Sequence, residues 1–178
     1  MIALKRIIKY VKTTANFGVW YNKDTNDVLA GYSDAEDDRK STLGDCFYVG
    51  NNLVFWMSKK QNSISLSTAK AEYITASSCC TQLLWMQKLL HDYGICQEHF
   101  TIYCNNTSAI NISKNPVQHS RTKHIEIQYH FIRDLVEDGT LTLEFIHTND
   151  QKADLFTKLI DSKRFEFLCQ NIGVISMD

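Results

Sequence analysis

The sequence predicts an α/β fold in which a mixed five-stranded sheet carries packed helices. Two observations lead to this prediction. Runs of β-branched and aromatic residues bounded by turn formers indicate strands, and apolar residues three and four positions apart indicate helices. After a first helix and one extra extended segment, these runs follow in the order of three strands, a helix, a strand, two helices, a strand and a helix. The first three strands are expected to be antiparallel, and those separated by helices to be parallel.

Length and composition are those of one globular domain. The chain has 178 residues, 44% of them apolar, which is enough for a continuous core. Its formal net charge of −1 excludes a wholesale basic nucleic-acid binder. The six cysteines show no metal-knuckle spacing, and no apolar run approaches the roughly 18 residues of a membrane span. We therefore expect no membrane partner and a reducing intracellular compartment.

The amino-terminal part is predicted to contain a helix followed by two hairpins. Apolar residues over 4–11 recur at helical spacing among basic residues, which predicts a short amphipathic helix. Extended runs at 17–21 and 28–33, joined by a stretch rich in Asn and Asp, predict a first hairpin. Runs at 45–49 and 53–58 flank a Gly-Asn-Asn turn and predict a second hairpin.

A long helix is predicted after the second hairpin. Apolar residues at helical spacing continue to Gly94, which suits a left-handed helix end, and Ser67 or Thr68 is the natural N-cap. A strand over 100–104 follows. The remaining elements are a short helix, a second long helix, a strand and a closing helix, predicted at 108–112, 124–139, 141–146 and 153–159.

Three carboxylates occupy positions where predicted strands and helices meet. Asp34 ends a central strand, Glu72 lies in the first turns of the long helix, and Asp154 starts the last helix. A strand end and two helix starts can converge above one sheet edge, and such a cluster can hold two divalent cations about 4 Å apart for phosphodiester hydrolysis. The strand over 100–104 delivers Asn105 to the same edge, where an amide cannot replace the negative charge of a carboxylate.

Each of these residues also has a simpler interpretation. Asp34 and Asn105 can be turn formers at strand ends. Glu72 can be a solvated helix carboxylate, and Asp154 can be a charge favoured by the dipole at a helix start. Only the combination of the residues favours a metal site.

Six segments form a recognisable series along the chain. They are Gly-Tyr-Ser-Asp-Ala at 31–35, Asp-Arg-Lys-Ser-Thr at 38–42, Trp-Met-Ser-Lys-Lys-Gln at 56–61, Leu-Ser-Thr-Ala-Lys-Ala-Glu-Tyr at 66–73, Asn-Pro-Val-Gln-His-Ser-Arg-Thr-Lys-His-Ile at 115–125 and Ala-Asp-Leu-Phe-Thr-Lys at 153–158. In this order they resemble the ribonuclease H domain of copia-type long-terminal-repeat retrotransposon Pol polyproteins, from the first helix to about Leu159. The resemblance implies a ribonuclease H-like sheet and cleavage of the RNA strand in RNA–DNA hybrids.

The resemblance implies a catalytic site that uses two Mg²⁺ ions, with Mn²⁺ as a substitute. Asp34, Glu72 and Asp154 match the family's metal ligands, and Asn105 stands where the family has Asp. The loop after Asp34 is also several residues shorter than in the family, with Glu36 in place of an Asp-Trp-Ala-Gly stretch. These two departures predict a weak or inactive enzyme.

Nucleic-acid contacts are predicted from two sources. The resemblance places Ser67 and Thr68 at a DNA phosphate, and Asn106 next to the strand-end ligand. A basic tract after the only proline and two lysines after a Trp-bearing strand can also contact phosphates, although both can equally be solvated surface. The predicted nucleic-acid-binding residues are Ser67, Thr68, Asn106, Lys59, Lys60, Arg121, Lys123 and His124.

The resemblance further divides the chain into three parts. Residues 1–27 resemble the end of the reverse transcriptase, 28–160 the ribonuclease H-like domain, and 161–178 form a carboxyl-terminal extension. Expected partners are an RNA–DNA hybrid and the reverse transcriptase of the same polyprotein, and the expected location is the cytoplasm, a virus-like particle or the nucleus. Two alternatives stay open: a non-catalytic module that binds hybrids, and a decayed retroelement fragment.

Overall fold

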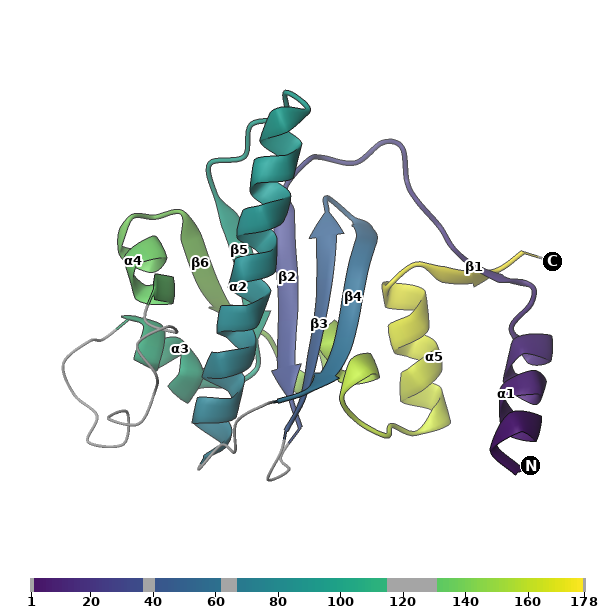
Figure 1. Cartoon of the computed structure of the whole chain (residues 1–178). Coiled ribbons are helices and arrows are strands. Elements are labelled where there is room, and N and C mark those ends of the chain that lie inside the picture. The colour runs from purple at the N-terminus through teal and green to yellow at the C-terminus, as the bar shows by residue number, and fades with distance from the viewer. Residues whose placement is uncertain (1, 37–40, 62–66, 115–130, 178) are drawn as a thin grey trace.

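The computed structural model of the protein describes residues 2–36, 41–61, 67–114 and 131–177 (Figure 1). The strands are β1 (Phe17–Val19), β2 (Leu29–Ala35), β3 (Thr42–Val49), β4 (Asn52–Lys60), β5 (Phe100–Cys104), β6 (Leu141–Phe145) and β7 (Val174–Ser176). The α-helices are α1 (Ile2–Thr13), α2 (Thr68–Asp92), α3 (Thr107–Lys114), α4 (Phe131–Glu137) and α5 (Ser162–Asn171). Two short 3₁₀ helices are η2 (Thr148–Asp150) and η3 (Lys152–Phe156).

The main sheet has five strands in the order β4-β3-β2-β5-β6. The pairs β2–β3 and β3–β4 are antiparallel, whereas β2–β5 and β5–β6 are parallel. This arrangement confirms the predicted mixed sheet. Ser33 pairs with Cys104, so the carboxyl ends of β2 and β5 lie at the same edge.

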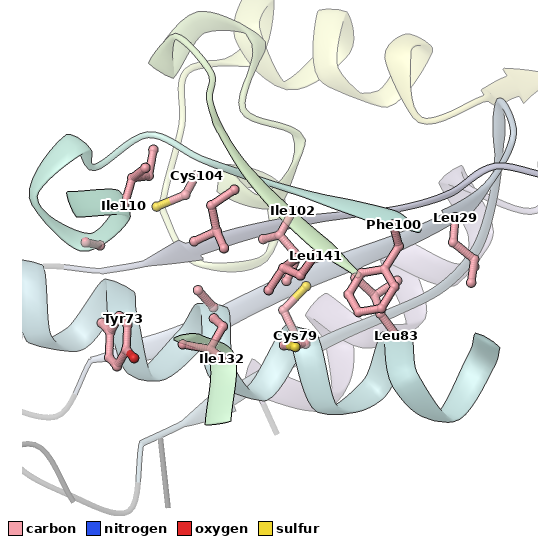
Figure 2. Packing of buried hydrophobic residues seen from close by; sticks show 14 of the residues in the cluster. Leu29, Tyr73, Cys79, Leu83, Phe100, Ile102, Cys104, Ile110, Ile132 and Leu141 are labelled. Atoms are coloured by element: carbon pink, nitrogen blue, oxygen red, sulfur yellow. The ribbon is translucent and has the colours of Figure 1, made fainter. Parts of the chain in front are cut away.

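Helices cover both faces of this sheet. Figure 1 shows α2 running across the sheet along β2, with α3 and α4 beside it. Figure 2 shows the main core between α2 and the strands, where Cys79 and Leu83 of α2 face Phe100 and Ile102 of β5. The other face carries η3, with α5 packed against it. The apolar residues that recur at helical spacing in α2 thus form one stripe, which is buried against the sheet.

Two glycines let the helices approach the central strands closely. A Cβ on Gly31 would lie 2.6 Å from Cys79 Sγ, so β2 fits against α2 only without a side chain there. A Cβ on Gly44 would lie 2.9 Å from the Ala153 carbonyl oxygen and would also meet Thr157. Gly44 pairs with Asp34, so this contact sets how η3 sits above the end of β2.

The predicted first hairpin is wrong. β1 pairs antiparallel with β7 at the other end of the chain, and the two form a separate two-stranded sheet. The polar stretch after β1 instead attaches to the turn between β3 and β4. Asn52 Nδ2 donates to the Asn22 carbonyl oxygen, and Thr25 Oγ1 accepts from the Asn51 backbone N–H. This polar stretch is therefore a loop that is hydrogen-bonded to the β3–β4 turn, and it is not a hairpin turn.

The carboxyl-terminal helix also differs from the prediction. The stretch expected as a closing helix at 153–159 is the short η3, and α5 follows it with Asp161 as N-cap. Asp161 accepts from the backbone N–H groups of Lys163 and Arg164, which explains why the helix begins there. Of the long helix predicted over 124–139, α4 is confirmed, and the portion before 131 lies outside the described residues.

The predicted amino-terminal helix is confirmed as α1, which lies at the periphery of the molecule (Figure 1). None of its residues is buried, and its apolar stripe faces solvent. Within the described ranges, no helix is long and apolar enough to cross a bilayer.

We expect Gly44→Ala to destabilise the protein by about 1–3 kcal/mol, because the added methyl group must push η3 away from β3. Urea unfolding measures this loss. Gly18→Ala is the matched control, because a Cβ there meets only the flexible side chain of Met177, at 3.1 Å. Equal stabilities for the two variants would contradict this account of the packing between η3 and β3.

Candidate active site

The four residues predicted for the catalytic site converge at one edge of the sheet. Asp34 lies near the end of β2, and Asn105 directly follows β5. Asn105 Nδ2 donates to Asp34 Oδ1 at 3.2 Å. Asp154 comes from η3, and Lys158 Nζ joins it to Asp34, with 2.9 Å to an oxygen of each carboxylate. Glu72 of α2 lies close enough to Asp34 and Asp154 that repulsion between the carboxylates raises the pKa of Glu72.

The carboxylates of this edge are buried. Asp34 and Asp154 are fully buried, and Glu72 is 5% exposed. Burial, then repulsion by Asp34, raises the pKa of Glu72 to about 8, although a backbone hydrogen bond from Ala35 and the charge of Lys158 oppose the rise. Burial and Asp34 also raise the pKa of Asp154, against the lowering effect of Lys158 and Arg164. The site therefore holds more negative charge than its surroundings balance.

Three side chains that sequence reasoning did not single out contact these carboxylates. Thr157 Oγ1 donates to Asp34 Oδ2, and Arg164 Nη2 of α5 forms an ion pair with Asp154 Oδ2. Burial alone would lower the pKa of Lys158, but Asp34 and Asp154 outweigh it and raise that pKa. Lys158 and Thr157 belong to a segment that the sequence analysis quoted, whereas Arg164 gave no sequence signal, because it lies beyond that segment on α5.

Asp45 is a further buried acid beside the site. It lies on β3 opposite Ser33, is fully buried, and neither of its carboxylate oxygens has a hydrogen-bond partner among the described residues. Burial, with repulsion by Glu72 and Asp34, raises its pKa well above the ordinary value. The sequence signal for this residue is a charge within the otherwise apolar run 45–49, which was predicted only as a strand.

Gln151 holds η3, and with it Asp154, against the sheet. It is fully buried. Its Nε2 donates to the Ser33 carbonyl oxygen at 3.0 Å, and its Oε1 accepts from the Ala153 N–H at 3.3 Å. One side chain thus caps η3 and ties it to the strand residue that precedes Asp34.

Five of the eight predicted nucleic-acid-binding residues lie within the described part of the chain, at the ends of β4 and β5 and the start of α2. Ser67 is the N-cap of α2, as predicted, and both Ser67 and Thr68 are exposed. Asn106 Oδ1 accepts from the Ala109 N–H, so its side chain caps the start of α3. Lys59 and Lys60 are exposed at the end of β4. The other three, Arg121, Lys123 and His124, lie outside the described residues.

Comparison with known proteins identifies the chain. It is 36% identical to the retrovirus-related Pol polyprotein of transposon TNT 1-94 from Nicotiana tabacum, over 98% of this chain and 13% of that protein. It is 39% identical to the corresponding polyprotein of transposon RE1 from Arabidopsis thaliana, over 97% of this chain and 12% of that protein. The chain belongs to the copia-type retrotransposon Pol polyproteins. It spans only about an eighth of the length of these relatives.

Solved structures place this Pol polyprotein segment in the ribonuclease H-like fold. The N-terminal ribonuclease H domain of a Mycobacterium tuberculosis protein matches with a TM-score of 0.55 at 7% identity, covering 82% of this chain and 98% of that one. LC11-RNase H1, solved in complex with an RNA/DNA hybrid, matches with a TM-score of 0.52 at 13% identity, covering 72% of this chain and 93% of that one. No protein-family model matches the chain.

The donor set of this edge suits a hard divalent cation. Carboxylate oxygens of Asp34, Glu72 and Asp154 and the amide oxygen of Asn105 are ligands that Mg²⁺ prefers. As the side chains stand, however, no three His, Cys, Asp or Glu groups in the described part of the chain are arranged to hold a metal ion. Lys158 Nζ lies 2.9 Å from Oδ1 of both Asp34 and Asp154. Its positive charge thus occupies the space between the two carboxylates.

Without divalent metal, we expect the protein to lose stability as pH rises from about 4.5 to about 8. The pKa of Glu72 is about 8 in the folded state against an ordinary value of 4.5, so the folded state binds more protons in this window. The slope from one such group reaches at most about 1.4 kcal/mol per pH unit. Urea unfolding in a chelator, at several pH values, measures it, and Glu72→Gln should flatten it. A stability that rises over this range would contradict the pKa assignment.

Proposed function

We propose that this chain is a ribonuclease H-type hydrolase domain that cleaves the RNA strand of RNA–DNA hybrids weakly. The observation that carries the proposal is the convergence of Asp34, Glu72 and Asp154 with Asn105 at the common end of β2 and β5. The structural match to LC11-RNase H1, whose structure contains an RNA/DNA hybrid, supports the same choice of substrate.

The proposed cofactor is Mg²⁺, with Mn²⁺ as a substitute. Asp34, Glu72, Asp154 and the Asn105 amide oxygen would hold it. When bound in pairs, such ions supply an activated water and stabilise the leaving oxygen. Before that, Lys158 must leave the space between Asp34 and Asp154, and the Asn105 amide must turn its oxygen toward the site, because its nitrogen now donates to Asp34.

Low activity follows from the charges of the ligands. An amide at 105 contributes no negative charge, so the cluster attracts two dications less strongly than one with a fourth carboxylate. Arg164 and Lys158 also occupy oxygens of Asp154 and compete for it. Both effects weaken metal binding.

Contacts with the hybrid would come from the surface beside the site. The exposed start of α2 at Ser67 and Thr68 presents backbone N–H groups, which favour a phosphate. Lys59, Lys60 and Asn106 flank it in the proposal, together with the predicted tract of Arg121, Lys123 and His124.

The wider setting is also proposed. Residues 1–27 would be the end of a reverse transcriptase, 28–160 the hydrolase domain and 161–178 an extension, and the reverse transcriptase of the same polyprotein would be a partner. Relatives described as Pol polyproteins support this setting. It places the protein in a reducing compartment of the cell or in a virus-like particle.

A second candidate function is a non-catalytic module that binds hybrids. The ion pairs of Lys158 and Arg164 favour it, because they neutralise part of the acidic charge of the site without metal. Hybrid binding that weakens with salt and shows no turnover in Mg²⁺ or Mn²⁺ would select it. Absence of hybrid affinity at low salt would instead favour a decayed fragment.

We expect Asn105→Asp to raise the rate of hybrid cleavage by at least about tenfold, because it adds a charged ligand, and losses at ligand-supporting positions are commonly 10–100-fold. Gel analysis of a labelled RNA–DNA hybrid in Mg²⁺ and in Mn²⁺ measures the rate.

Asp154→Asn in the Asn105→Asp background is the control, because it should abolish cleavage and thus attribute the activity to this site. A wild-type protein that cleaves as fast as Asn105→Asp would contradict the view that the amide is disabling.

Lys158→Met is expected to tighten Mg²⁺ binding by at least about tenfold, since it removes the cation that lies 2.9 Å from both Asp34 and Asp154. Calorimetric titration with Mg²⁺ measures the dissociation constant. Lys163→Met, which removes an exposed lysine of α5, serves as the matched control. Unchanged or weaker binding in Lys158→Met would mean that the ammonium does not compete with the metal.

A further inference from the structure

A groove of about 430 Å³ lies on the η3 side of the sheet, beside the metal-site edge but lined by none of the four predicted site residues. Its floor comes from β2, β3 and β5, and its rim from the β3–β4 turn, η3 and the end of α5. Its size falls within the range of small-molecule sites, about 300–1,000 Å³. The residues that matter here are Tyr32, Tyr48, Tyr103, Lys152, Asn51 and Asn171.

Three tyrosines line the floor as a continuous aromatic row. Tyr32 pairs with Tyr103 in the parallel ladder, and their rings stack with centroids 4.8 Å apart. Tyr48 meets Tyr32 edge to face at 5.4 Å. Tyr48 is almost fully buried, and its hydroxyl lies within hydrogen-bond reach of the Cys46 thiol. The groove therefore exposes only the rings of Tyr32 and Tyr103, which are partly buried.

Lys152 brings a positive charge to this row. Its Nζ lies 4.2 Å from the centroid of the Tyr48 ring and 4.8 Å from that of Tyr32. Among the residues that the structure describes, no carboxylate forms an ion pair with it. A partly buried ammonium that has no carboxylate partner among the described residues can bind an anionic group.

The groove adjoins the metal site along the same face of the sheet. Tyr32 and Tyr103 each come two residues before a site residue, Asp34 and Asn105 respectively. Side chains two apart on a strand share a face and lie about 7 Å from each other. Lys152 likewise precedes Asp154 by two residues within η3. One set of elements therefore positions both the acidic edge and the groove.

We propose that this groove binds a single nucleotide, with its phosphate at Lys152 and its base on the tyrosine row. Aromatic faces beside a cation suit a nucleobase joined to a phosphate, because every base has a π-face and the cation pairs with the phosphate. The amides of Asn51 and Asn171 at the rim can meet the polar edge of the base. The inference deepens the proposed function, on which it rests, by adding a nucleotide subsite next to the cleavage site.

The test is calorimetric titration in a chelator with adenosine 5′-monophosphate, adenosine and inorganic phosphate. Adenosine 5′-monophosphate should bind more tightly than either of the other two. Lys152→Met should weaken its binding about tenfold and leave adenosine unchanged, because only the charge contact is lost. Tyr103→Leu should weaken both, and Lys88→Met, on the exposed side of α2, should change neither.

A second experiment distinguishes whether the bound nucleotide is free or belongs to a nucleic-acid strand. Wild type and Lys152→Met are titrated, again in a chelator, with a hybrid that is blunt or carries a short single-stranded extension. Tighter binding of the extended hybrid by wild type alone assigns the site to a strand, and equal binding with retained affinity for the mononucleotide assigns it to a free nucleotide.

Two results would overturn the inference: no binding of adenosine 5′-monophosphate, or binding that Lys152→Met leaves unchanged. Unfolding curves confirm that each variant is folded. Because no metal is present in either experiment, failure here is distinct from failure to cleave the hybrid in Mg²⁺.

Discussion

Burial of negative charge at one end of β2 is the constraint on which the site depends. Asp34, Asp154 and Asp45 are fully buried, Glu72 is nearly so, and the described residues contribute only Lys158 and Arg164 as their ion-pair partners. Buried ions are tolerated only when they are paired, hydrogen-bonded or neutralised by a proton. All three solutions occur here: ion pairs for Asp34 and Asp154, a hydrogen bond from Thr157 to Asp34, and raised pKa values for Glu72 and Asp45.

Asn105 fits this charge balance. Its amide nitrogen donates to Asp34 Oδ1 at 3.2 Å, so it stabilises a carboxylate where a fourth carboxylate would repel it. The same substitution that lowers the attraction for dications therefore lowers the electrostatic strain of the metal-free protein. At position 105, an amide favours the stability of the metal-free protein, whereas a carboxylate would favour affinity for metal.

Much of the sheet could be predicted from sequence, since the strands from β2 to β4 are joined by short connections and α2 has a clear helical period. The pairing of β1 with β7 could not, because its partners lie at opposite ends of the chain and local turn residues pointed to a hairpin. The positions of Asp34, Glu72, Asn105 and Asp154 at one edge follow from parallel strand ends. Their roles as ligands remain predictions. The cations that neutralise them depend on side-chain direction, which spacing alone does not give.

The packing of α5 has a consequence for the occupancy of the site. Arg164 joins α5 to Asp154, while the sheet that follows α5 has a ladder of only three residue pairs, which is a weak anchor. Detachment of α5 and β7 would remove the Arg164 guanidinium and leave Asp154 without this ion pair. By thermodynamic reciprocity, an ion that binds Asp154 in place of Arg164 loosens α5 to the same extent that undocking α5 favours the ion. Arg164 of α5 and a bound cation would thus compete for one carboxylate, so the docking of α5 controls how strongly Asp154 attracts a metal ion.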